Sequence, residues 1–132
     1  MRDIEADPLP AVQRHGLGLL PYFPLASGLL TGKYRRNVTP PQGSRFAANT
    51  GLTGRYMNDA NWFVVEKLGK FCASRGRTIL ELAFGWLLAH DLVPSVIAGA
   101  TRPEQLDQNV AAAGWKLTPE EKREVDRLTT RA

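Results

Sequence analysis

A short apolar run, a glycine turn and the start of a helix follow one another in residues 94–109, PSVIAGATRPEQLDQN. The pattern predicts a buried strand over residues 95–98 and a turn at Gly99. Thr101 and Glu104 have the spacing of a capping box, in which a hydroxyl and a carboxylate satisfy free backbone N–H groups at a helix start. A strand that leads directly into a helix is the order found in β/α folds.

A helix start of this kind is suited to binding an anion. Its first turn carries free N–H groups and roughly half a positive charge, and the planar guanidinium of Arg102 fits phosphate. Alternatively, Thr101 and Glu104 only cap a helix and Arg102 is a solvated charge. Residues 18–33, GLLPYFPLASGLLTGK, favour the anion site, because a second apolar run there leads into a loop of Pro, Ser and Gly ending in Lys33. Two such units suggest one ligand held between them.

The charges of the chain are unevenly distributed. Its net charge is +4, and residues 8–58 contain no Asp or Glu. Such a stretch favours an anionic partner. Nucleic acid fits less well than a small polyphosphate ligand, because the stretch lacks a recognition helix and aromatic residues that alternate with basic ones. The basic residues of the stretch are Arg14, Lys33, Arg35, Arg36, Arg45 and Arg55.

The composition is that of one globular domain, with 132 residues of which 43% are hydrophobic and 23% charged. The single cysteine, Cys72, lies in an apolar helical stretch and is expected to be a packed thiol. We therefore expect no disulfide framework, no metal site and a reducing, cytoplasmic location. We also expect no membrane contact, since no apolar run reaches about 18 residues and the first residues lack the apolar core of a signal peptide.

Alternating elements predict α/β architecture with a parallel sheet covered by helices. Only two strands are visible, whereas a complete eight-unit barrel needs about 250 residues. We therefore interpret the chain, residues 1–132, as a single partial domain of a larger fold. Its parts are the end of a helix (1–16), a strand with a long loop (17–58), a helical region (59–91), and a second strand with C-terminal helices (92–132).

Local signals place the elements within these parts. A helix over residues 7–15 is expected to end at Gly16, followed by a buried strand over 17–23. Residues 24–58 are expected to form a loop that is too polar for a core and typical of a functional lid or of a disordered segment.

Further helix starts are expected at Asn58 or Asp59, at Thr78 with Glu81, and at Thr118 with Pro119 and Glu121. The first of these helices has Trp62, Val65, Leu68, Phe71 and Cys72 on one side, and the helix after Thr101 is expected to turn Leu106, Val110 and Ala113 inward and to expose Gln108.

Four motifs in this chain resemble the aldo-keto reductases in order and approximate spacing. They are LLPYFPLASGLLTGKY (19–34), PPQGSRF (40–46), ILELAFGWLL (79–88) and SVIAGATRPEQLDQN (95–109). The resemblance extends from about residue 8 to residue 128. It implies the C-terminal portion of a (β/α)8 TIM barrel, comprising strands 7 and 8 with their flanking helices, and residues 1–16 would then end helix 6.

The resemblance further implies an NADP(H) site. Tyr22 is similar to the aromatic residue that stacks on the nicotinamide, although packing in a core is the alternative for it. Phe23 stands where a serine is usual, which leaves only the backbone contact there. The loop around the pyrophosphate would consist of Pro24, Leu25, Ala26, Ser27 and Gly28, with Lys33 and Arg45 closing over it. The pocket for the 2′-phosphate would consist of Gly99, Thr101 and Arg102. The residues that contact the adenine end would be Gln105, Gln108 and Asn109.

The catalytic Asp, Tyr, Lys and His of that family lie on earlier strands, so the resemblance assigns no catalytic residue here. His15 and His90 are expected at helix ends. The function implied is the C-terminal, NADP(H)-binding part of an aldo-keto reductase that reversibly reduces aldehydes or ketones. The alternative is a non-catalytic nucleotide-binding or interaction module, akin to a potassium-channel β subunit. In either case we expect pairing with the missing part of the barrel, or self-association.

We predict that this chain alone has no reductase activity, because hydride transfer to a carbonyl needs a proton donor within hydrogen-bond reach and none is assigned. The measurement is the loss of NADPH absorbance with a panel of reactive aldehydes. Turnover that copurifies with the chain after removal of contaminating reductases would contradict the prediction.

Overall fold

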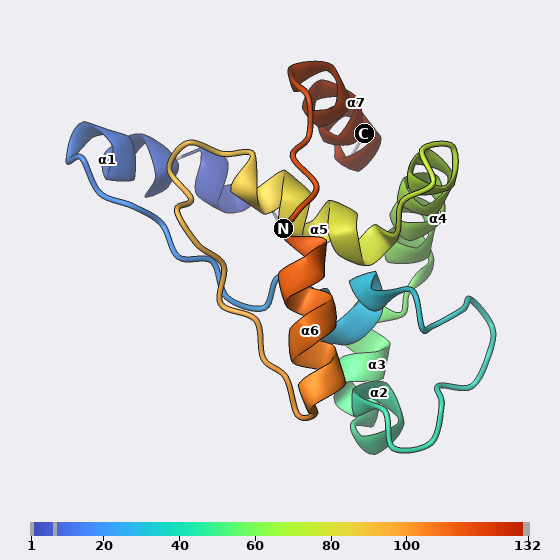
Figure 1. Ribbon diagram of the computed structural model, residues 1–132. Helices are drawn as coiled ribbons and strands as arrows, with labels where there is room; N and C mark the ends of the chain where they lie inside the picture. Colours follow the sequence, from blue (N-terminus) through green and yellow to red (C-terminus); the bar gives the residue numbers. More distant parts are fainter. Residues whose placement is uncertain (1, 7, 131–132) are drawn as a thin grey trace.

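The computed structural model describes residues 2–6 and 8–130, so Asp7, at the predicted start of the first helix, lies outside the described residues. Figure 1 shows α5 at the centre of the helices and α1 at the end of an arm that leads away from them. The elements are η1 (Asp3–Glu5), α1 (Pro8–Arg14), η2 (Ala26–Thr31), α2 (Arg45–Ala48), α3 (Thr50–Tyr56), α4 (Asp59–Ala73), α5 (Ile79–Leu88), α6 (Pro103–Ala112) and α7 (Pro119–Thr129).

Several local predictions are confirmed. Gly16 ends α1 in the left-handed conformation, with φ of 61°. Asn58 caps α4, while α5 and α7 each begin with a complete capping box formed by Thr78 with Glu81 and by Thr118 with Glu121.

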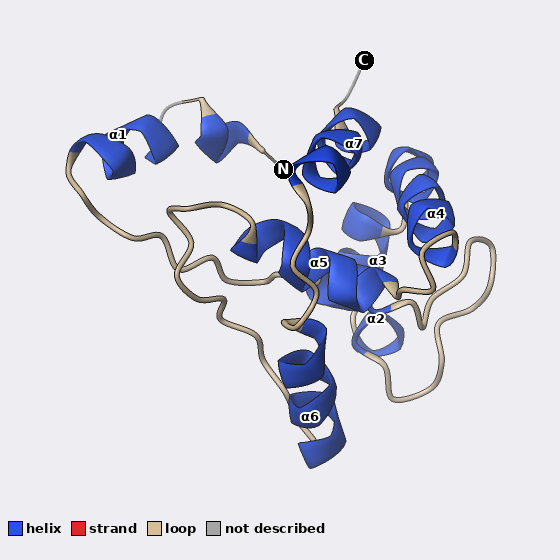
Figure 2. Cartoon of the chain, turned by 45° about the horizontal axis from the view of Figure 1, so that its top comes forward, coloured by secondary structure: helices blue, strands red, loops and turns tan. Residues whose placement is uncertain are grey.

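The two predicted strands are present only as extended segments, which Figure 2 draws as loops. In the described part of the chain their pairing is a single parallel bridge between Tyr22 and Ile97. The Ile97 N–H donates to the Pro21 carbonyl at 2.9 Å, and the Leu19 N–H donates to the Leu92 carbonyl at 2.6 Å. Each segment has only one partner here, the first contains Pro21 and the second directly follows Pro94, and proline has no N–H to donate, so no ladder develops. The expectation of buried strands is wrong for this chain, because most of their large apolar side chains are exposed.

The main core lies between α4, α5 and α7, where the predicted apolar faces meet. Cys72 is buried in it, and burial raises the pKa of its thiol to about 11. The thiol is therefore a packed, protonated side chain, as predicted. The buried members of this core are Leu68, Phe71, Cys72, Ile79, Leu82, Trp115 and Val125.

Residues 24–58 correct the expectation of a polar loop. They contain η2, α2 and α3, and they contribute three of the four buried residues of a second core: Leu29, Tyr34 and Phe46, which pack with Trp62 of α4. The rings of Tyr34 and Phe46 have centroids 4.7 Å apart. The apolar residues are widely spaced in this stretch, so they form a core only because Trp62 gives them a common surface.

The predicted inward face of α6 is wrong for Leu106 and Val110, while Ala113, the C-cap residue, is half-buried. Leu106 and Val110 are 57% and 68% exposed, whereas Asn109 and Ala112 are buried. Gln108 is exposed, as predicted. Because α6 packs on α5 through its other face, its larger apolar side chains have no cover within the described structure.

A cluster of polar contacts joins the first described residues to α5 and α7. Arg2 pairs with Glu5 and with Asp126 of α7, and the Trp86 indole N–H donates to Asp126 at 2.9 Å. Burial would raise the pKa of Asp126, but hydrogen bonds from Trp86 and Lys122 outweigh it and lower that pKa. The carboxylate therefore stays ionised and ties the three elements together.

We predict that Gly85→Ala destabilises the chain by about 1 to 3 kcal/mol, the usual cost of overpacking. A Cβ at this position in α5 would lie 2.6 Å from the Trp115 carbonyl oxygen, so the backbone would have to move. Gly69→Ala in α4 is the matched control, since its Cβ meets nothing within 4 Å. The control is expected to be neutral or stabilising by up to about 1 kcal/mol. Urea unfolding followed by circular dichroism compares the two, and equal effects would contradict the prediction.

Candidate functional site

The parallel bridge between Tyr22 and Ile97 brings the two predicted halves of the site to one end of the paired segments. Both segments run in the same direction through the bridge. The loop after Tyr22 and the turn after Ile97 therefore leave at the same carboxyl end, which is where ligands bind in parallel α/β sheets. Figure 1 shows the two segments meeting and then diverging, the earlier one passing behind α6 and the later one continuing to the start of α6.

The loop that follows Tyr22 has an unusual backbone. Phe23, Ala26 and Ser27 all have positive φ values, of 56°, 48° and 59°, and Gly28 follows at 103°. Each non-glycine residue in this region costs on the order of 1 kcal/mol. Hydrogen bonds hold the conformation, with the Gly28 N–H donating to the Leu25 carbonyl at 2.8 Å. Backbone strain of this kind clusters at ligand sites, so the loop is the strongest local sign of function.

The side chains of this loop differ in what they present. Tyr22 is 73% exposed, with the Phe23 ring against it at a centroid distance of 5.1 Å, so its own ring is accessible for stacking. Ser27, by contrast, is buried, and its hydroxyl is less accessible than the sequence suggested. Pro24, Leu25 and Ala26 are half-buried between these two.

Lys33 lies over the loop. A Cβ at Gly28 would make ordinary van der Waals contact with the Lys33 Cε at 3.5 Å and the Tyr34 ring at 3.4 Å, so both side chains lie beside this turn, and its φ of 103° is what favours glycine. The Thr31 hydroxyl donates to the Gly28 carbonyl at 2.7 Å and anchors the same position. Sequence reasoning missed this contact of Thr31, for which only its spacing from Gly28 was a signal. Arg45, at the start of α2, is exposed, and α2 packs on η2, so the structure places Arg45 near the loop without a described contact to it.

The start of α6 differs from the prediction. The Thr101–Glu104 capping box does not form, and Arg102 is the N-cap residue, without a side-chain cap. Instead, the Gln105 side-chain oxygen accepts from the Thr101 N–H at 2.8 Å and from the Thr101 hydroxyl at 3.1 Å. Pro103 explains the shift, since proline favours the first helical position and therefore moves the cap one residue along the chain. The sequence signal for this arrangement was the pattern R-P-x-Q at residues 102–105.

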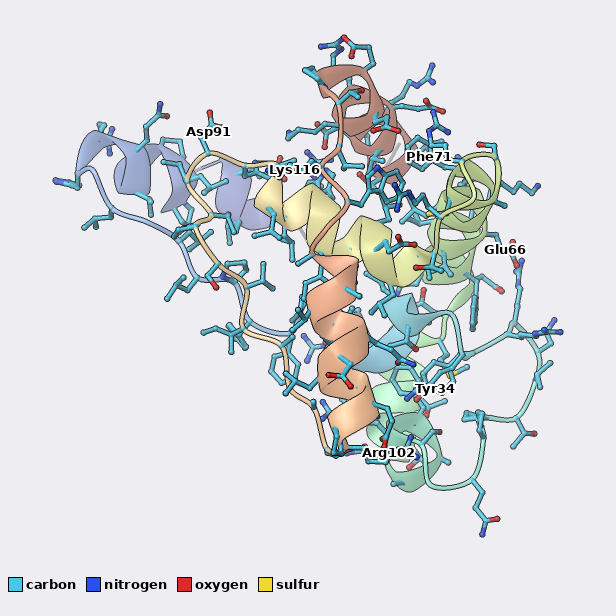
Figure 3. The ribbon with its side chains drawn as sticks, viewed as in Figure 1. Tyr34, Glu66, Phe71, Asp91, Arg102 and Lys116 are labelled. Carbon is cyan, nitrogen blue, oxygen red and sulfur yellow. The ribbon has the colours of Figure 1, made fainter. Side chains whose placement is uncertain are left out.

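The remaining predicted residues divide into two groups. Gly99, Arg102 and Gln108 are exposed, and Figure 3 labels Arg102 at the start of α6. Gln105 is half-buried and Asn109 buried, as expected for two residues that share one helix face. Asn109 therefore faces the protein more than an open site.

The donor set fits the phosphate groups of a nucleotide cofactor. Lys33 beside the Gly28 turn, Arg102 and the first turn of a ten-residue helix α6 supply positive charge and N–H donors at one end of the paired segments. A side chain at Gly28 would fill the cradle that Lys33 covers. Exposed Tyr22 adds a flat surface beside it.

The histidines are placed away from this loop. His15 is exposed after the end of α1. The His90 ring packs edge-on against Trp86, and its Nε2 is buried without a described partner. Burial lowers the pKa of His90, so the ring is neutral near pH 7. No helix in the described ranges 2–6 and 8–130 is long and apolar enough to cross a bilayer.

Comparison with known proteins gives a consistent family. The family model described as Aldo/keto reductase family matches residues 1–130. L-glyceraldehyde 3-phosphate reductase from Escherichia coli (strain K12) is 40% identical over 108 residues, which are 79% of this chain and 31% of that protein. A putative voltage-gated potassium channel subunit beta from Schizosaccharomyces pombe is 36% identical over 130 residues, 94% of this chain and 37% of that protein.

Solved structures agree. Glycerol dehydrogenase AKR11B4 from Gluconobacter oxydans matches with a TM-score of 0.72 and 31% identity, covering 97% of this chain and 38% of that chain. The likeness supports the TIM-barrel family of folds. The chain spans about a third of the length of the curated relatives it matches.

Proposed function

Because this chain belongs to the aldo/keto reductase family, we propose that it is the C-terminal, NADP(H)-binding part of a barrel that reversibly reduces aldehydes or ketones to alcohols. The observation that supports this most is the parallel bridge between Tyr22 and Ile97. It sets the strained loop 23–28 and the start of α6 at the same end of two neighbouring segments. In the proposal these segments are barrel strands 7 and 8.

In this proposal each residue binds the group of the cofactor that its side-chain chemistry suits. Exposed Tyr22 would lie against the flat nicotinamide ring, and Lys33 would neutralise the pyrophosphate over the Gly28 turn. Arg102 would take the 2′-phosphate, because a guanidinium offers paired N–H donors in the geometry of phosphate oxygens. When bound, the cofactor supplies the hydride, and the residues of this chain hold and orient it.

The catalytic acid is proposed to come from polypeptide beyond these 132 residues, as the family's remaining strands would supply it. A second candidate function is binding without turnover. It is favoured by the S. pombe relative, which covers 94% of this chain and is named as a channel subunit. Cofactor binding combined with a lack of turnover in the full assembly would distinguish it from the reductase.

We also propose that the exposed apolar side chains of the two extended segments and of α6 are covered by further polypeptide. The chain covers 31% and 38% of two relatives, so most of the length of each relative lies outside the match, and unpaired segments with apolar side chains seek partners. Without that polypeptide, copies of the chain associate with one another. The side chains concerned are Leu17, Leu20, Ile97, Leu106 and Val110.

For the 2′-phosphate, Arg102→Ala in the assembled protein is expected to weaken NADPH binding by about tenfold to a hundredfold. A hydrogen bond to a charged group contributes roughly 1.5 to 3 kcal/mol. NADH binding should barely change, because NADH lacks that phosphate. Fluorescence titration at fixed salt measures both dissociation constants, and Arg14→Ala on α1 controls for the loss of general positive charge. Equal losses for the two cofactors would assign Arg102 only a general field, and no loss for either would make it a solvated charge.

For the uncovered surface, the isolated chain is expected to associate as its concentration rises. Light scattering over a concentration series measures this, and Val110→Asp on α6 should weaken the association. Val38→Asp is the matched control, because Val38 is 55% exposed but lies in the loop after η2. A compact, concentration-independent monomer that binds no hydrophobic dye would contradict the proposal, as would equal effects of the two variants.

A further inference from the structure

Arg2 links the segment 2–5 to both α5 and α7. Its guanidinium pairs with the Asp126 carboxylate of α7 at 3.1 Å and donates to the Thr129 hydroxyl at 2.9 Å. It also lies over the Trp86 ring of α5, 5.1 Å from the ring centroid. Trp86 in turn donates its indole N–H to Asp126 at 2.9 Å. Arg2, Trp86 and Asp126 therefore form a clasp that joins the three parts of the chain, and we call it the Arg2 clasp.

The ring of His90, just after the end of α5, packs against this clasp. It meets Trp86 edge-on, with the two ring centroids 4.7 Å apart. Its Nε2 is buried and finds no hydrogen-bond partner among the described residues. A neutral imidazole tolerates this position, because one of its two nitrogens carries no proton. A protonated ring would place a charged N–H there with no acceptor, which is costly in a buried position.

The charged groups around His90 do not compensate a further positive charge. Burial is the largest effect on its pKa and lowers it, and the cations Lys122 and Arg2 lower it further. The carboxylates of Glu5 and Asp126 act in the opposite direction. Both carboxylates are already engaged, since Glu5 pairs with Arg2, and Asp126 pairs with Arg2 and Lys122. An imidazolium at this place would therefore join two cations that share the available anions.

We propose that His90 is a pH-sensitive latch, which keeps the Arg2 clasp closed while its ring is neutral and opens the clasp when the ring takes up a proton. The proton comes from solvent, and the charged ring has to leave its place against Trp86 to reach water. Once it leaves, the indole that holds Arg2 and Asp126 together loses its edge contact. The segment 2–5 then loosens from α5 and α7. The latch requires no cofactor.

One attraction opposes this opening. A cation beside an indole ring is stabilised by the ring's π electrons, so an imidazolium could gain from Trp86. Arg2 already lies over that ring, however, and a second cation beside it is repelled. The two effects have opposite signs in the pH dependence of stability, so a measurement separates them.

Urea unfolding at about pH 7.5 and about pH 5.5, on either side of the ordinary histidine pKa, gives the first test. Because the pKa of His90 is lowered in the folded chain, the unfolded chain binds the proton more readily. Stability is therefore complete above the ordinary pKa and falls as the pH drops below it. One such histidine raises the unfolding equilibrium constant by up to about tenfold over this range. The protein is kept dilute enough to avoid association.

Three variants show whether this pH dependence belongs to His90. His90→Phe keeps an aromatic ring against Trp86 but cannot take up a proton, so it should lose the dependence. His90→Gln should lose it as well and serves if the phenylalanine variant does not fold. His15→Gln is the matched control, because His15 is the other histidine and is exposed after α1. It should keep the wild-type dependence. Asp126, whose pKa is lowered, stays ionised throughout.

NMR of the folded wild-type chain gives the second test. The imidazole signals of His90 should titrate at a lower pH than those of an ordinary histidine. The indole N–H signal of Trp86 should move toward its free position in step with His90, because the bond to Asp126 opens with the latch. In His90→Phe the Trp86 signal should stay in place over the same range, which a merely packed ring at position 90 would not require of the wild type.

Three results would overturn the latch. Equal pH dependence in the wild type and the His90 variants would assign the effect to other groups, as would its loss in His15→Gln. A Trp86 signal that stays in place while His90 titrates would mean that the clasp tolerates the charge. Stability that rises on acidification would mean that the attraction to the Trp86 ring prevails. If neither His90 variant folds, the titration of the wild type decides.

Discussion

Close packing around α5 is the constraint on which the rest of the structure depends. Leu82 is almost wholly buried in it, and Gly85 lets the backbone at Trp115 approach to within contact. Helices α4 and α6 and the short helix η2 all pack against α5. Because η2 follows the first loop of the site and α6 follows the second turn, both halves of the site are anchored to one helix. Their relative position is therefore set by side-chain packing more than by the bridge between the extended segments.

The same anchoring explains how a strained loop persists. Positive φ values at Phe23, Ala26 and Ser27 oppose the ordinary preference of L-residues. Immediately after them, Leu29 is buried in the second core, and the Thr31 hydroxyl binds the Gly28 carbonyl. The burial of Leu29 thus offsets the conformational cost of the positive φ values in the residues just before it. The loop is therefore buried at Leu29, where it meets the second core, and exposed at Tyr22 and Phe23.

The parts of the fold that depend on local chemistry could be predicted from the sequence. Thr78 with Glu81 and Thr118 with Glu121 start helices because their partners are three residues away. The prediction was wrong where the outcome depends on distant residues, as for Val110, which no described part of the chain covers. The loop that ends in Lys33 was predicted from its own residues as part of an anion site, whereas Arg45 was assigned to the site only through the family resemblance.

Two other differences between the prediction and the structure have causes that composition alone does not indicate. At the start of α6, Pro103 displaced the cap by one residue, and the partner of Thr101 became Gln105. Residues 24–58 seemed too polar for a core because Leu29, Tyr34 and Phe46 are far apart in the sequence. They pack with Trp62, which lies on α4, a helix that the sequence predicts from its start at Asn58 or Asp59 and from its apolar side.

The bridge between Tyr22 and Ile97 has a consequence for how the chain folds. Its two residues lie far apart in sequence, with η2 and the helices α2 to α5 between them. Closing so long a loop costs entropy before any contact compensates for it, so such pairings form late and slowly compared with helices. The helices around α5 can condense first and shorten the effective loop. The ligand end would then be assembled last, and a nascent chain would spend its earliest moments with the two segments apart and their backbone groups open to other strands.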